Sequence, residues 1–136
     1  MDIQVYEDIL QGLKDYNEKL GKPYGNAVVR YPTGNTTYPH SVFRETTNLT
    51  NQVYSTRLDR IATLGYSLMV YAKQKDKMPK DRVAREVAKE LNTYLTEVVG
   101  LKQVGYNYVP QINDNSICAV AITYTAQLHE NRQRFL

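Results

Sequence analysis

The sequence predicts an α+β fold, a two-layer sandwich in which two helices pack on one face of an antiparallel sheet of four to five strands. Two segments carry apolar residues at helical spacing, and several shorter segments alternate apolar and polar residues. The predicted order is α-β-β-β-α-β-β. Strands that follow one another in runs, rather than in strict alternation with helices, are typical of this class.

Length and composition fit one domain spanning residues 1–136. Hydrophobic residues make up 42% of the chain, which is enough for a core without disulfides or metal. The single cysteine, Cys118, excludes an internal disulfide. No apolar run approaches the ~20 residues of a membrane helix, so we expect no membrane partner. The start of the chain lacks a basic segment, so we expect no signal peptide.

The first predicted element is a helix over residues 3–20, with Asp2 as its N-terminal cap. Gly21 stands where a glycine commonly ends a helix, and Pro23 follows it. The helix has one apolar stripe, formed by Tyr6, Ile9, Leu10, Leu13 and Tyr16.

Two strands are predicted next, over residues 26–31 and 40–47, separated by a turn at 32–35 that contains Pro and Gly. The second strand alternates poorly between apolar and polar residues. We therefore interpret it as an edge strand.

Residues 46–58 form a polar segment rich in Thr and Asn, which we predict to be a long loop. Loops of this length are usually functional or disordered, although an ordinary hairpin connection is an equal alternative. Tyr and Arg are enriched at interface hot spots. The contact residues that we expect here are Asn48, Gln52, Tyr54 and Arg57.

A long strand over residues 60–73 is predicted to lie in the centre of the sheet. After a charged turn comes a helix over residues 80–99, which Gly100 ends. Its continuous apolar stripe is Val83, Ala84, Val87, Ala88, Leu91, Leu95 and Val98.

Two further strands, over residues 101–112 and 116–128, complete the predicted sheet, with a turn at 113–115 between them. The first should place Val104, Tyr106 and Tyr108 on one side, and the second should be central. Residues 129–136 form a polar tail.

No pattern in the sequence indicates catalysis, a cofactor or a metal site. Neither His40 nor His129 has a carboxylate at a sequence spacing that would orient its imidazole, apart from Glu130 next to His129. Cys118 lies in an apolar strand, where a free cysteine acts as a small hydrophobic residue. A face with Tyr106, Tyr108 and Tyr124 would resemble a base-stacking platform. The net charge of +3 is small, however, so we expect no sequence-specific nucleic-acid binding.

The layout resembles the tail terminator proteins of tailed bacteriophages, also called tail completion or head–tail joining proteins. The resemblance covers nearly the whole chain. It is carried by the N-terminal helix, the strand at 39–48, the Thr/Asn-rich segment, the strand at 61–72, the helix at 83–98 and the closing strand at 119–124.

This resemblance implies a structural protein of the virion, assembled in the host cytoplasm, and no enzyme activity. It implies a ring of identical subunits, typically a hexamer, that caps the tail tube and contacts a head-completion or connector protein. Arg132 and Arg134 of the polar tail are further candidates for contacts with neighbours. Two alternatives remain open: another connector or tube protein of the same particle, or a small ferredoxin-like ligand-binding or enzymatic domain.

Overall fold

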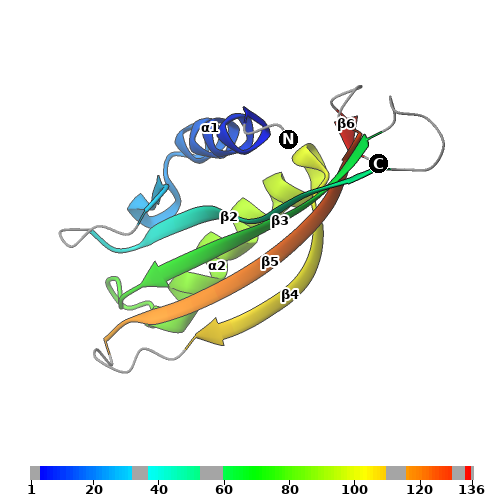
Figure 1. The fold of residues 1–136 in the computed structure, drawn as a ribbon. Coiled ribbons are helices and arrows are strands. Elements are labelled where there is room, and N and C mark those ends of the chain that lie inside the picture. The colour runs from blue at the N-terminus through cyan, green and yellow to red at the C-terminus, as the bar shows by residue number, and fades with distance from the viewer. Residues whose placement is uncertain (1–3, 32–36, 53–59, 110–115, 130–133, 136) are drawn as a thin grey trace.

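The computed structural model describes residues 4–31, 37–52, 60–109, 116–129 and 134–135. In this part of the chain two helical units lie against one face of a curved sheet (Figure 1). The α+β class and the order α-β-β-β-α-β-β are therefore confirmed.

The helices fall where the apolar stripes place them. Helix α1 spans Gln4–Lys19, and α2 spans Lys80–Thr93 and continues into a π-helical turn, η2, over Tyr94–Val99. A short 3-10 turn, η1, follows α1 at Pro23–Gly25. The predicted helix over 80–99 thus consists of α2 and η2 together.

The predicted glycine stops are also present. Gly21 and Gly100 have φ angles of 79° and 90°, the left-handed region in which glycine is favoured. After Gly100 the Leu101 amide donates to the Leu95 carbonyl at 2.9 Å, which satisfies a helix-end acceptor.

The strands lie side by side in the order β1-β2-β3-β5-β4, and the short β6 pairs with β5. Two long strands are central, in agreement with the prediction. The strand bounds are β1 Ala27–Val29, β2 His40–Gln52, β3 Arg60–Ala72, β4 Lys102–Val109, β5 Cys118–His129 and β6 Arg134–Phe135.

The sheet is mixed, so the prediction of a purely antiparallel sheet is wrong. Strand β1 pairs in parallel with the start of β2, through Ala27–His40 and Val29–Val42. Parallel neighbours need a connection that returns to the start of the first strand. The turn predicted at 32–35 lies outside the described residues.

Strand β2 is longer than predicted and takes in part of the segment expected to be a loop. Residues 46–52 pair with β3, with the last register pair at Gln52 and Arg60. The apolar pattern is poor because Ser41, Val42 and Phe43 are all buried in succession, and a bulge between Glu45 and Thr47 then shifts the alternation. Residues 53–59 lie outside the described part.

The core lies between the helices and the sheet face that they cover (Figure 1). The ring of Tyr6 on α1 stacks on Phe43 and Tyr66 of the sheet, with centroids 5.7 and 6.3 Å apart. The fully buried residues of α2 and η2 are Val83, Ala84, Val87, Ala88, Leu91 and Leu95. One core therefore joins both layers.

Val98, the last residue of the predicted apolar stripe, is not buried with the others: its side chain is 67% exposed. A π-helical turn bonds i to i+5 and so rotates the side chains relative to an α-helix. Val99, rather than Val98, packs against the core.

A buried polar cluster links α1 to the first two strands. Asn26 donates from Nδ2 to Asn17 Oδ1 at 3.2 Å and accepts at Oδ1 from the Ser41 hydroxyl at 2.9 Å. Asn17 Nδ2 in turn donates to the Asn26 carbonyl at 2.9 Å. All three residues are at most 2% exposed. This cluster fixes how α1 meets β1 and β2.

Candidate assembly surface

The two segments predicted to contact neighbours meet at one end of the sheet. Gln52 pairs with Arg60 across the β2–β3 hairpin, and the adjacent Ile61 pairs with His129 of β5. His129 also pairs with Arg134 of β6. Figure 1 shows this end beyond the helical layer, with β6 beside the ends of β3 and β5. Strand register therefore brings together residues far apart in the sequence.

The structure describes the backbone of three of the six predicted contact residues. Asn48 and Gln52 lie in β2, and Arg134 lies in β6. Tyr54, Arg57 and Arg132 lie outside the described residues, so their predicted contacts stay predictions. Of the six, Asn48 alone has a described side chain, and it is partly buried.

Asn48 makes a local contact with its own strand. Its Nδ2 donates to Glu45 Oε1 at 3.4 Å, across the bulge. The other oxygens of the pair, Asn48 Oδ1 and Glu45 Oε2, are buried and have no hydrogen-bond partner in the described part of the chain. An unsatisfied buried acceptor costs about 1–3 kcal/mol.

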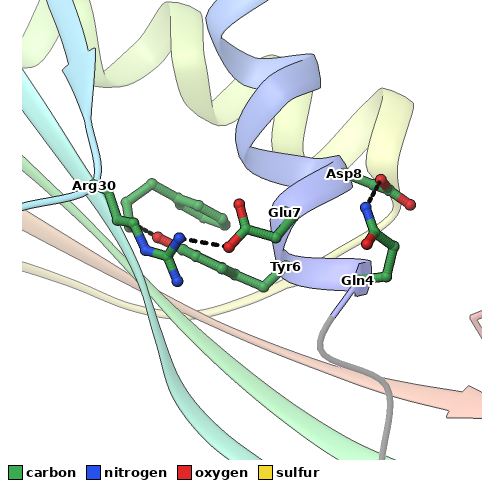
Figure 2. A network of polar contacts seen from close by, with 6 residues as sticks. Gln4, Tyr6, Glu7, Asp8 and Arg30 are labelled. Atoms are coloured by element: carbon green, nitrogen blue, oxygen red, sulfur yellow. Dashed lines mark hydrogen bonds and ion pairs between the residues drawn. The ribbon is translucent and has the colours of Figure 1, made fainter.

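A second polar cluster joins α1 to β1 near this part of β2 (Figure 2). Arg30 Nη1 lies 2.5 Å from Glu7 Oε1, and its guanidinium is 5.2 Å from the centre of the Tyr6 ring. The Tyr6 hydroxyl donates to the Phe43 carbonyl at 2.5 Å. Burial raises the pKa of Tyr6, against the opposing effect of the Arg30 charge.

The residues around this cluster line a cavity of about 300 Å³. Two arginines face two carboxylates there, so the lining has no net charge. The lining residues are Tyr6, Glu7, Arg30, Tyr31, Arg44 and Glu45. The arrangement holds α1 on the sheet and has no excess charge that would select an ion.

His40 is buried among aromatic rings at the start of β2. It is 4% exposed and stacks on Tyr71, with centroids 4.9 Å apart, while the Tyr38 ring lies 5.0 Å away. Its Nδ1 has no hydrogen-bond partner in the described residues, and burial lowers the pKa of the imidazole. The nearby cation is Lys73, which lies 4.7 Å from the Tyr38 ring.

This burial predicts a pH-dependent stability. As pH falls below about 6.5, the unfolded imidazole takes up a proton before the folded one does. The free energy of unfolding should therefore decrease between pH 6.5 and the lower folded pKa, and His40 should contribute no slope above that window. His40→Phe keeps the stacking and should remove this part of the slope in urea titrations, whereas His129→Gln should retain it. Equal slopes for wild type and His40→Phe would contradict the prediction.

Cys118 lies at the start of β5. Cys118 is a free, partly buried thiol whose pKa is raised by burial. Among the described residues no three His, Cys, Asp or Glu side chains gather as metal ligands. The described helices are also too short or too polar to cross a bilayer.

Strand β4 exposes three of its large apolar side chains. Val104, Tyr106 and Tyr108 are 60%, 40% and 52% exposed. A bulge between Gln103 and Gly105 removes Val104 from the predicted alternation. Tyr124, in contrast, is buried and donates to Asn92 Oδ1 at 2.6 Å, so it cannot share a stacking platform with the two exposed tyrosines.

Comparison with known proteins gives no relative for this chain. No protein-family model matches it, and no curated protein is found as a relative by sequence.

Proposed function

We propose that the protein is a structural assembly protein of a phage or phage-like tail, forming a ring that ends the tail tube and joins it to the head or neck. The observation that carries this proposal is the convergence of two polar segments at one end of the sheet. Residues of both segments, including Gln52 and Arg134, thereby belong to one surface that extends past the helices.

A ring also needs contacts between identical subunits that are not self-complementary. Head-to-tail contacts close into a ring when the rotation between subunits permits it. The hexamer, the tail tube and the head-completion or connector protein are the partners that the resemblance implies.

The test begins with the particle itself. Removing the gene from a genome that produces such particles should leave tails of uncontrolled length, separated from heads. Purified protein added back should restore joined particles, and electron microscopy should show rings at the tube ends. Normal tails without the protein would overturn the proposal. Tails of normal length that fail to join heads would instead support a different connector position.

A shortened hairpin should separate stability from assembly. Because Gln52 and Arg60 are register partners, residues 53–59 can be replaced by Asn-Gly, a sequence suited to a two-residue turn. We expect an unchanged melting temperature and loss of tail attachment, since the change keeps every described strand pair and removes Tyr54 and Arg57. The entropy cost of closing a loop changes by only ~0.6 kcal/mol per doubling of its length, so a shorter loop alters stability little through this effect.

The matched control replaces Tyr54 and Arg57 by Ser within the full-length hairpin. If these side chains make the contact, the control should lose attachment as the shortened variant does. Normal particles from the shortened variant would end the contact hypothesis for this segment. A large fall in melting temperature would assign it to the folded core.

A further inference from the structure

We propose that neighbouring copies of this chain join by strand pairing, with the β4 edge of one copy pairing with the distal β2 edge of the next. This inference rests on the proposed function in that it explains how a ring would close. The two edges are residues 103–108 of β4 and residues 46–52 of β2.

The first edge is β4, the last strand in the sheet order. A strand at the edge of a sheet presents backbone donors and acceptors to another strand. Tyr106 and Tyr108 are large exposed side chains on this strand, and their rings meet edge to face at 6.1 Å. Tyr is enriched at interface hot spots. The edge thus combines a backbone template with side chains suited to burial.

The second edge is the distal half of β2. Strand β1 pairs only with His40–Val42, and the Tyr6 hydroxyl occupies the Phe43 carbonyl. Beyond the bulge, residues 46–52 pair with β3 on one side, and no described strand lies on the other. Asn48 adds its buried acceptor without a partner in the described residues.

Neither of the two edge stretches contains the charged residues that commonly protect a sheet edge from pairing with another chain. Natural proteins commonly guard edge strands with Lys, inward-pointing charges or Pro. Charged residues make up 23% of the chain, but residues 46–52 (Thr-Thr-Asn-Leu-Thr-Asn-Gln) and 103–108 (Gln-Val-Gly-Tyr-Asn-Tyr) contain none, and no Pro. Each edge does carry a β-bulge at one end, between Glu45 and Thr47 in β2 and between Gln103 and Gly105 in β4, and Lys102 precedes the β4 stretch. Beyond the bulges neither stretch has a charge or a proline that would block an incoming strand, which favours an edge that is covered after folding.

A second copy is the occupant that both edges specify. The edges are of similar length, and they lie on opposite sides of the same sheet (Figure 1). Each copy would therefore pair through its β4 edge with one neighbour and through its β2 edge with another, which is a head-to-tail contact. Such a contact repeats from subunit to subunit and is compatible with ring closure.

Two blocking variants of the full chain test the pairing. One carries Tyr106→Lys and Tyr108→Lys on β4, and the other carries Thr46→Lys and Thr50→Lys on β2. Leu20→Lys, at an exposed position at the end of α1, is the matched control. Circular dichroism melting checks that each variant is folded, and light scattering coupled to size-exclusion chromatography gives the mass.

We expect oligomers from wild type and Leu20→Lys, and folded monomers from each blocking variant alone. An equal mixture of the two blocking variants should form a one-to-one dimer, since one intact edge of each kind remains. Dimers from the β2 variant alone would show β4-to-β4 pairing and overturn the head-to-tail inference.

The remaining outcomes separate this inference from the proposed function. Oligomers that persist in both folded blocking variants would overturn strand pairing but leave a ring built on another surface. Wild-type protein that stays monomeric at its highest soluble concentration would also overturn the pairing. The gene-removal experiment judges the tail function independently of either result. Should a blocking variant unfold, Asn107→Lys on β4 or Thr47→Lys on β2 replaces it.

Discussion

Replacing Leu91 by Ala should lower the free energy of unfolding by about 2–5 kcal/mol. Leu91 is fully buried on α2, whose apolar side packs on the central strands β3 and β5. The substitution removes buried methyl groups and leaves a cavity that the rigid sheet beneath can fill only in part. Urea unfolding at constant pH, followed by circular dichroism, measures the change.

Val98→Ala is the matched control from the same helical segment. It removes apolar carbon from a side chain that is 67% exposed, so we expect a change within about 0.5 kcal/mol. A loss below that figure for Leu91→Ala would contradict the packing of α2 on the sheet. A large loss for Val98→Ala would show that the π-helical turn does not place this side chain in solvent.

Replacing Asn26 by Ala should cost about 2–6 kcal/mol, because two buried groups lose their partners at about 1–3 kcal/mol each. These groups are the Asn17 Oδ1 acceptor and the Ser41 hydroxyl donor. The Asn17 bond to the Asn26 main-chain carbonyl remains, so part of the link between α1 and β1 survives. Chemical unfolding gives the cost, and hydrogen exchange of α1 amides should increase.

A double-mutant cycle with Ser41→Ala isolates the side-chain bond. The double variant should lose less than the sum of the single variants, because the second substitution removes a group already without a partner. Asn107→Ala on the exposed edge strand is the control and should be nearly neutral. Additive single changes would show that Asn26 and Ser41 do not act together.

The sequence by itself determined the helical segments, the glycines that end them and the α+β class. The stripes of α1 and α2 and the glycines at 21 and 100 act within a few residues along the chain, so their signals are local. The alternation of β3 and β5 likewise indicated strands buried in the centre of the sheet. Each of these elements follows from interactions between residues close in sequence.

Strand neighbours and their register were decided by the tertiary structure. The parallel pairing of β1 with β2 depends on where the chain returns, which side-chain periodicity does not record. The polar residues 46–52 lack a strand pattern of their own, and pairing with β3 makes them a strand. The position of Val98 depends on the π-helical turn, which no residue type announces.

The candidate surface likewise has features that the sequence predicted and features that only the tertiary structure decided. Composition singled out the polar segment that contains Asn48 and Gln52, and the resemblance to tail terminator proteins added Arg134 of the polar tail. Only the pairing of β3 with β5, and of β5 with β6, places those segments at one end of the sheet. The alternating pattern of β4 did not predict that this strand lies at the edge of the sheet. A strand's place in the sheet order depends on contacts between residues distant in the sequence.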